Sequence, residues 1–172
     1  MDRNGCSIGT HILSYKPILL TRVDHRLLHG QVATSWVNGL GSDCIFCVGD
    51  KVANDPVWKT TLKMGKPTGC KLVIKDMAHA IEAINSGVTD KYRMIICLRS
   101  IEEAKQLVEG CPQIKSLNLG NTLESPTTKQ ISSQIFLEPE EVEMLKELGE
   151  RGVEVEIRAL ADDKKENALA LL

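Results

Sequence analysis

A short charged segment, residues 22–32, holds the side chains of this chain that could carry out chemistry. It reads Arg-Val-Asp-His-Arg-Leu-Leu-His-Gly-Gln-Val and directly follows the apolar run Pro17–Thr21. A histidine that holds a phosphoryl group needs cations for the phosphate oxygens, a partner that orients its ring, and free backbone N–H groups at a helix start. The segment offers all three, so it predicts a phosphate-handling histidine.

The position of the next helix indicates which of the two histidines in this segment would hold the phosphoryl group. An apolar stripe begins at Val32, which predicts that a helix starts near Gly30 and places His29 at its N-terminus. The positive end of the helix dipole favours the neutral, nucleophilic form of the imidazole ring. The free N–H groups of Gly30 and Gln31 at the same helix start are candidates for binding phosphate oxygens.

Two arginines and an aspartate complete the candidate set. Arg26, three residues before His29, is the better-placed fork for bidentate contact with a phosphate, and Arg22 completes a clamp or anchors the loop. A carboxylate is repelled by phosphate, so we expect Asp24 to fix an arginine or to accept a ring or backbone N–H. The competing interpretation is a solvated turn whose charges simply lie on the surface.

Apolar runs alternate with helical periodicity from Ile18 onward, which is typical of β/α units. The predicted strands are Ile18–Thr21, Cys44–Val48, Lys71–Ile74, Met94–Leu98, Ile114–Leu119, Ile131–Leu137 and Val153–Ile157. Asp55, Ser100 and Glu138 mark the starts of helices between them. The predicted fold class is α/β, an open doubly wound, mainly parallel sheet of about seven strands with helices on both faces.

A second polar segment, Asn118–Asn121, follows the fifth predicted strand. Parallel strands share their polarity, so this segment falls at the same carboxyl edge of the sheet as His29. We therefore expect Asn118, Gly120 and Asn121 to support the wall of the site. Ordinary turn chemistry also explains Asn and Gly after a strand, and both interpretations stand at this stage.

Composition excludes several classes of function. The chain has 172 residues with a formal net charge of −2, and its aromatic content is 3%. Nucleic-acid binding usually requires a concentrated basic face and aromatic stacking platforms, so no nucleic-acid partner is expected. We expect residues 1–15 to be an N-terminal extension, disordered or not native to the protein, and residues 16–172 to form one domain.

The cysteines do not predict a metal site. Most of the six lie within or beside aliphatic runs, where a reduced cysteine acts as a small buried hydrophobe. Cys44 and Cys47 have the spacing of zinc and redox pairs, but residues three apart on a strand point to opposite faces. Reduced cysteines and the lack of a secretion signal predict a cytoplasmic protein.

The charged segment resembles a motif of the IIB component of the mannose/fructose/sorbose class of bacterial phosphoenolpyruvate-dependent sugar phosphotransferase systems, the N-acetylgalactosamine type included. The pattern Arg-x-Asp-x-Arg-Leu-x-His-Gly-Gln-Val carries the likeness, which extends from about Ile18 to about Leu160. Segments 52–56, 118–121, 129–132 and 148–153 are also similar to the family. One departure is His25, where the family usually has an acidic or amide residue.

The resemblance implies a phosphoryl carrier. His29 would receive the phosphoryl group from a phosphohistidine of a IIA protein or domain and pass it to a hexose bound by the membrane IIC and IID subunits. Arg26 would bind the phosphate, and Asp24 and Arg22 would support the loop. The resemblance further implies a phosphotransferase without cofactor or metal, at the inner face of the membrane through the permease, and it is compatible with a homodimer. Mannose, fructose, sorbose and N-acetylated hexosamines all stay open as the sugar.

Two other functions are compatible with the residues. A phosphatase or mutase with a phosphohistidine intermediate also places His-Gly after a first strand, but its motif has arginine directly before the histidine. Leu28 occupies that position here, and no second histidine lies in an obvious loop. A non-catalytic nucleotide-binding regulatory domain could use the same scaffold, and its binding would not depend on His29.

Overall fold

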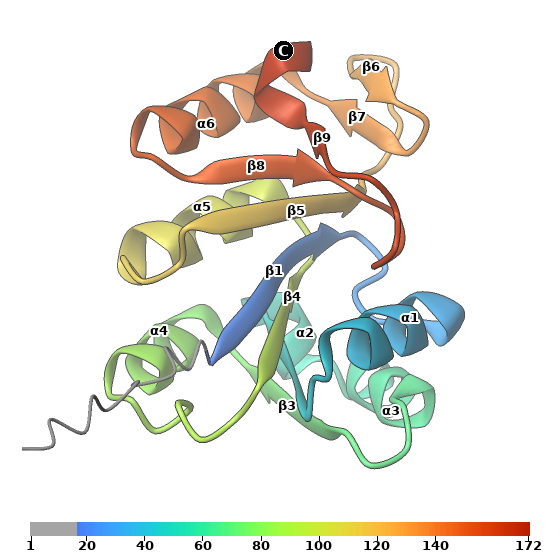
Figure 1. The fold of residues 1–172 in the computed structure, drawn as a ribbon, viewed down its shortest axis with the longest axis vertical. Helices are drawn as coiled ribbons and strands as arrows, with labels where there is room; N and C mark the ends of the chain where they lie inside the picture. The colour runs from blue at the N-terminus through green and yellow to red at the C-terminus, as the bar shows by residue number, and fades with distance from the viewer. Residues whose placement is uncertain (1–16) are drawn as a thin grey trace, which may run out of the picture.

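Seven strands form one mainly parallel sheet in the computed structural model, which describes residues 17–172 (Figure 1). They are β1 (Ile18–Asp24), β2 (Cys44–Val48), β3 (Lys71–Lys75), β4 (Met94–Leu98), β5 (Ser116–Asn121), β8 (Glu154–Ile157) and β9 (Glu166–Asn167). Their order across the sheet is β3-β2-β4-β1-β5-β8-β9, and only β9 pairs antiparallel. The predicted fold class is confirmed. The predicted extension, residues 1–15, lies outside the described residues.

Helices cover both faces of this sheet (Figure 1). One face carries α1 (Gly30–Leu40), α2 (Asp50–Asn54) and α3 (Pro56–Gly65), and the other carries α4 (Met77–Asn85), α5 (Ile101–Gly110) and α6 (Pro139–Glu150). Each face buries its own apolar cluster. Trp36 and Leu62 belong to the first cluster, and Phe46, Leu107 and Leu145 belong to the second. Burial of these side chains is the main favourable term that holds helices and sheet together.

The predicted helix starts are confirmed by their caps. The Asp55 carboxylate accepts hydrogen bonds from the backbone N–H groups of Val57 (2.9 Å) and Trp58 (3.4 Å), and Pro56 occupies the first helical position of α3. The Ser100 hydroxyl accepts from the third backbone N–H of α5 at 3.2 Å. These side chains satisfy donors that have no partner within the helix, so each helix begins where the sequence indicates.

One predicted strand is wrong. The segment 131–137 is split into β6 (Lys129–Ser132) and β7 (Ile135–Leu137), an antiparallel pair that forms its own two-stranded sheet. Ser133 and Gln134 interrupt the apolar run and form the turn between the two strands. The seventh strand of the main sheet is instead β9, whose residues Glu166 and Asn167 are both exposed and carry no apolar signal.

The position of β1 determines where a ligand could bind. β1 lies between β4 and β5, and the chain runs from β1 toward β2 and β3 on one side and later through β5 to β8 on the other. The strand order therefore reverses beside β1. In open α/β sheets, the crevice at the carboxyl ends of the strands next to such a reversal is the usual ligand site.

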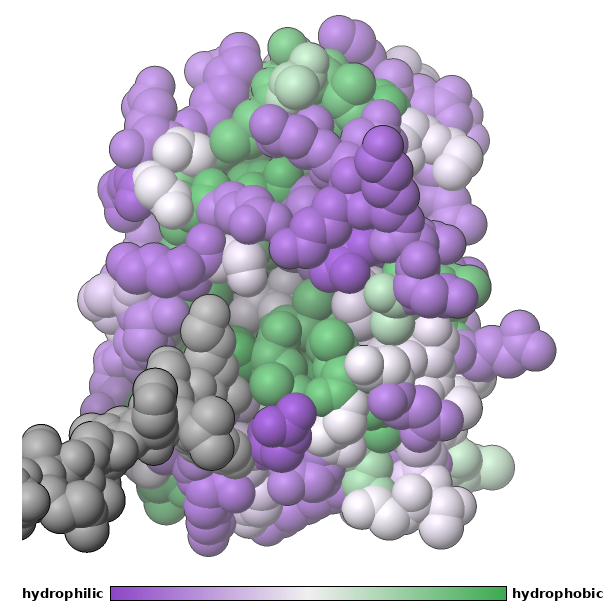
Figure 2. Space-filling view, viewed as in Figure 1, coloured by the Kyte–Doolittle hydropathy of each residue, from purple (hydrophilic) through white to green (hydrophobic). Residues whose placement is uncertain are grey.

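The surface also contains a hollow that does not lie at the carboxyl ends of the strands. Figure 2 shows apolar side chains exposed in the middle of the molecule, in the view of Figure 1. A cavity of about 250 Å³ is lined by Pro17, Ile18, Ile114 and Lys115, which lie where β1 and β5 begin. It is at the opposite edge of the sheet from His29. No helix within residues 17–172 is long and apolar enough to cross a membrane.

Candidate active site

The loop from β1 to α1 has a conformation that buries its leucines and presents its histidine. A backbone hydrogen bond from Leu27 to Asp24 (2.8 Å) closes a tight turn, and Leu27 has a positive φ of 59°. Leu27 and Leu28 are buried in the cluster beneath α1 and α3. α1 then begins at Gly30, as predicted, with the partly exposed His29 as its N-cap residue. A positive φ is costly for leucine, so the packing of both leucines must hold this conformation.

Asp24 is the centre of the polar contacts in this loop. Its side chain is 0% exposed, and its Oδ1 atom accepts a hydrogen bond from the backbone N–H of Arg26 at 3.0 Å. The Nε atom of Arg26 is 3.5 Å from the same oxygen, and Oδ2 accepts from Nη2 of Arg22 at 3.2 Å. A buried carboxylate needs such partners. Asp24 thus contacts both arginines and accepts a backbone N–H. Contact with an arginine and with a backbone N–H were both among the roles expected for it.

The structure separates the two arginines. Arg22 is 3% exposed, and its Nη1 atom donates to Oδ1 of Asn118 (2.7 Å) and to the carbonyl oxygen of Arg158 (2.9 Å). Burial lowers the pKa of the Arg22 guanidinium, and Asp24 partly opposes that shift. The side chain of Arg26, by contrast, is 45% exposed. Of the two roles expected for Arg22, the geometry matches the anchor, while Arg26 is the arginine open to a ligand.

His29 has the properties of a neutral nucleophile. Partial burial and the positive charge of Arg26 hold the pKa of its imidazole below the usual range, and the carboxylate of Asp24 opposes this shift. The ring is therefore mainly neutral at pH 7, which leaves one nitrogen with a free lone pair. Its Nδ1 atom is buried and has no hydrogen-bond partner among residues 17–172. The expected partner that orients the ring is thus not found as a hydrogen-bonded carboxylate among the described residues.

The polar segment Asn118–Asn121 forms the end of β5, rather than following the strand, and it supports the loop through Arg22 and through the backbone. Asn118 accepts from Arg22, and the carbonyl oxygen of Asn121 accepts from the backbone N–H of His25 at 3.2 Å. A Cβ atom on Gly120 would lie 2.0 Å from Cζ of Arg22. The guanidinium group therefore occupies the space that a side chain at position 120 would need. The structure brings Asn118, Gly120 and Asn121 together with the loop.

The remaining predicted residues lie at the start of α1. Gly30 has a φ of 43°, and a Cβ atom at this position would meet no other atom within 4 Å. Gln31 follows it on the exposed side of the first helical turn. The backbone N–H groups of a first turn have no partner within the helix. Both residues are therefore next to His29 and can offer N–H donors there.

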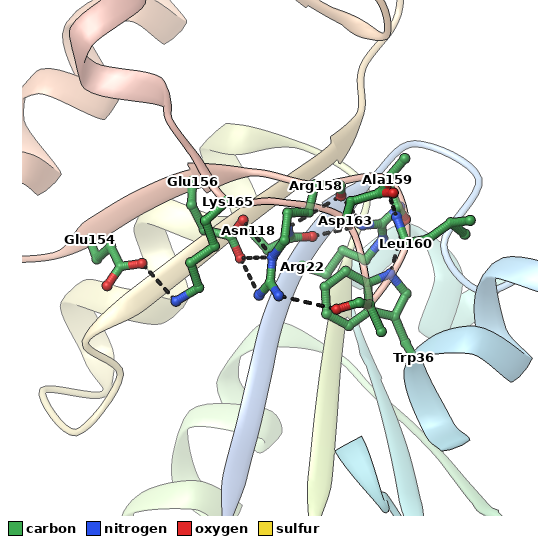
Figure 3. A network of polar contacts seen from close by, with 11 residues as sticks. Arg22, Trp36, Asn118, Glu154, Glu156, Arg158, Ala159, Leu160, Asp163 and Lys165 are labelled. Carbon is green, nitrogen blue, oxygen red and sulfur yellow. Dashed lines mark hydrogen bonds and ion pairs between the residues drawn. The ribbon is translucent and has the colours of Figure 1, made fainter. Parts of the chain in front are cut away.

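Trp36, Glu156 and Arg158 also belong to this network, and the sequence alone does not indicate their contacts (Figure 3). The indole Nε1 of Trp36 donates to the carbonyl oxygen of Ala159 at 3.1 Å. The guanidinium carbons of Arg22 and Arg158 lie 5.5 and 4.9 Å from the centroid of the Trp36 ring, within cation–π range. Arg158 also donates three hydrogen bonds to the buried carboxylate of Glu156. Trp36 matches the predicted apolar stripe of α1, but its contacts join residues far apart in sequence.

The cysteines that the structure describes lie in the core. The five cysteines of residues 17–172 are free thiols and are all buried. Burial is the largest cause that raises the pKa of Cys44, and likewise of Cys111, to about 11, so these thiols are protonated at neutral pH. No group of three or more His, Cys, Asp or Glu side chains within the described residues is arranged to hold a metal ion.

Relatives of known name match most of this chain. The mannose-specific EIIAB component of the phosphotransferase system (PTS) from Escherichia coli K12 is 32% identical over 158 residues, which cover 92% of this chain and 49% of that protein. The chain thus spans about half the length of the first relatives it matches. The sorbose-specific EIIB component of Lacticaseibacillus casei is 33% identical over 153 residues, 89% of this chain and 93% of that protein.

Solved structures and a family model agree with these relatives. The crystal structure of the IIBSor domain of the sorbose permease from Klebsiella pneumoniae superposes with a TM-score of 0.84 and 28% identity, covering 90% of this chain and 94% of that one. The N-acetylgalactosamine-specific IIB component 1 from Escherichia coli superposes with a TM-score of 0.77 and 31% identity, covering 87% and 97%. The family model described as "PTS system sorbose subfamily IIB component" matches residues 18–172. The chain therefore belongs to the sorbose-subfamily IIB components of the PTS.

Proposed function

We propose that this chain is the phosphoryl carrier of a sugar phosphotransferase system and that His29 is the residue that carries the phosphoryl group. In the first step, a ring nitrogen of His29 attacks the phosphorus of a phosphohistidine on a IIA protein or domain, and the phosphorus–nitrogen bond of the donor breaks. In the second step, a hydroxyl of a hexose in the IIC/IID permease attacks the same phosphorus and frees the histidine. The observation that carries the proposal is the neutral, partly exposed His29 at the start of α1, beside an exposed arginine.

The surrounding residues have roles that follow from their geometry. Transfer between two histidines needs mainly positioning and stabilisation of the charge on three phosphate oxygens. We assign that stabilisation to the guanidinium of Arg26 and to the backbone N–H groups of Gly30 and Gln31. Asp24 orients Arg26 and its backbone, and Arg22 compensates the buried charge of Asp24.

A transfer assay tests this function. The chain is incubated with phosphoenolpyruvate, the general phosphotransferase proteins and a phosphorylated IIA partner. We expect it to take up one phosphoryl group in an acid-labile form, as phosphohistidine is, and to keep it until a permease and a sugar are added. Hydrolysis of a generic phosphate ester by the isolated chain would favour the phosphatase alternative instead. Nucleotide binding that survives the change His29→Gln would favour the regulatory domain.

The names of the relatives do not agree on one sugar. The relatives are named for mannose, sorbose and N-acetylgalactosamine, so we propose a hexose or an N-acetylated hexosamine as the final acceptor. We further propose that the chain works at the inner face of the membrane, where it meets the IIC and IID subunits. A homodimer would leave this reaction unchanged, since every assigned group lies in one chain.

Docking of the IIA partner predicts a measurable effect at Leu123. Leu123 is 62% exposed, and it lines the same two cavities as His25 at the edge of the loop. A transient partner that covers His29 would bury this apolar side chain, so Leu123→Asp should raise the KM for phosphorylated IIA about tenfold. Val88→Asp is the matched control, because Val88 is 58% exposed and lies beyond α4, before β4 begins. Equal KM values for the two variants would contradict docking over this edge.

A further inference from the structure

Arg99 contacts the loop from β1 to α1, called the reactive loop below, from the side opposite Asp24. It follows β4 directly, and its Nε atom donates a hydrogen bond to the carbonyl oxygen of His25 at 3.1 Å. Two contacts hold Arg99 itself. Its guanidinium carbon lies 4.7 Å from the centroid of the Trp58 ring on α3, and its backbone N–H donates to Oε2 of Glu103 at 3.0 Å. Arg99 therefore ties the loop to α3 and to the first turn of α5.

The peptide unit that Arg99 contacts is the central one of the turn from Asp24 to Leu27. The carbonyl of His25 and the N–H of Arg26 belong to this single unit. Its carbonyl accepts from Arg99, and its N–H donates to Oδ1 of Asp24 at 3.0 Å. The plane of the unit is thus held from both sides by side chains of two different strand ends.

Rotation of this plane would redirect the phosphate-binding arginine. The central peptide unit of a four-residue turn has two orientations, which differ by a flip of about 180° and distinguish type I from type II turns. The flipped form requires a positive φ at the third residue, here Arg26, and that conformation is costly for arginine. In residues 17–172, Leu27 is the one residue other than glycine with a positive φ, so Arg26 is in the unflipped form. The direction in which its side chain leaves the backbone depends on that form.

We propose that Arg99 is a positioning residue for phosphoryl transfer at His29, because it fixes the central peptide plane of the Asp24–Leu27 turn and so aims Arg26 at the phosphate. This inference rests on the proposed carrier function. Arg99 acts through the His25 carbonyl, and it needs no contact with the phosphoryl group. Only the Nε atom makes the bond to the loop, so a positive charge alone does not replace it.

The variants Arg99→Gln and Arg99→Lys test the proposal. Lysine keeps a cation for the Trp58 ring but has no donor at the Nε position, so both variants should lose the bond to the His25 carbonyl. We expect the rate of transfer from phosphorylated IIA, measured at saturating donor, to fall about tenfold in both, with an unchanged KM. The backbone amide signal of Arg26 in a ¹⁵N–¹H spectrum should shift or broaden, whereas that of Ile96 in β4 should not.

Lys51→Gln is the matched control. Lys51 lines the same cavity of about 360 Å³ as Arg99 and His25 and carries the same charge, but it has no hydrogen bond to the loop among residues 17–172. The rate of transfer from phosphorylated IIA to Lys51→Gln should stay within about twofold of the wild-type rate. A wild-type rate in Arg99→Gln, or equal losses in Arg99→Gln and Lys51→Gln, would overturn the inference. Failure of the unchanged chain to accept a phosphoryl group would instead refute the carrier function, and the Arg26 amide signal still tests the turn.

Discussion

Replacement of Asp24 by alanine is expected to lower the free energy of unfolding by about 3–5 kcal/mol, because it leaves the buried charge of Arg22 without its counterion. Arg22 is 3% exposed and Asp24 is 0% exposed, so water compensates little of this loss. The same change removes the acceptor of the Arg26 backbone N–H. We therefore expect phosphorylation of His29 to fall at least 100-fold in the fraction that remains folded. Urea unfolding and single-turnover transfer at low temperature measure the two effects.

Two comparisons sharpen this prediction. Asp24→Asn keeps an acceptor for the N–H of Arg26 but removes the charge, so its rate of transfer should exceed that of Asp24→Ala. Asp162→Ala is the control, since Asp162 is exposed and has no hydrogen bond or ion pair among residues 17–172. Its free energy of unfolding should change by no more than about 0.5 kcal/mol. A loss of similar size in Asp162→Ala and Asp24→Ala would show that the buried pair has no special importance.

Gly120→Ala is expected to be the second most damaging change. The added Cβ atom would lie 2.0 Å from Cζ of Arg22, inside a buried part of the sheet. The φ of Gly120 is not in the left-handed region, so alanine is unfavourable because of the close approach to Arg22 and not because of the backbone conformation. Arg22 must move and lose its bonds to Asn118 and Asp24. We expect a loss of about 3 kcal/mol in the free energy of unfolding, together with a slower phosphoryl transfer.

A double-mutant cycle tests the cause. Arg22→Met removes the guanidinium group, which is the group that the new Cβ atom would meet. In that background, Gly120→Ala should cost less than about 1 kcal/mol in the free energy of unfolding. Equal costs in both backgrounds would mean that Gly120 is required for a reason other than the approach of Arg22.

Local patterns were sufficient for much of the fold and for the ends of the reactive loop. β2 and β4 have the predicted limits, Cys44–Val48 and Met94–Leu98, because each is a continuous apolar run buried on both faces. α1 begins at Gly30, where the apolar stripe and the glycine indicate it. These features depend on residues that are close together in the sequence, within one helical turn or one strand, so the sequence alone is sufficient to predict them.

The missing strand β9 and the orientation of Arg22 depend on contacts that a local pattern does not contain. β9 consists of Glu166 and Asn167, and it is a strand only because β8 offers it an open edge. The wrong strand, 131–137, is different, because its polar residues Ser133 and Gln134 are a local signal for the turn that divides it. Within the site, Arg22 bonds to Asn118 and to the carbonyl of Arg158, which are 96 and 136 residues away. The charge pattern predicts an arginine near the phosphate, but only these partners show that Arg22 faces inward.

Identification of the labelled residue tests the account most directly. The chain has four histidines, and after transfer from phosphorylated IIA the phosphoryl group can be located by mass spectrometry under alkaline conditions. The account predicts that the phosphoryl group is on His29 alone and that His29→Gln, with an unchanged unfolding curve, accepts none. A phosphoryl group on His25 or His79, or full labelling of His29→Gln, would contradict it.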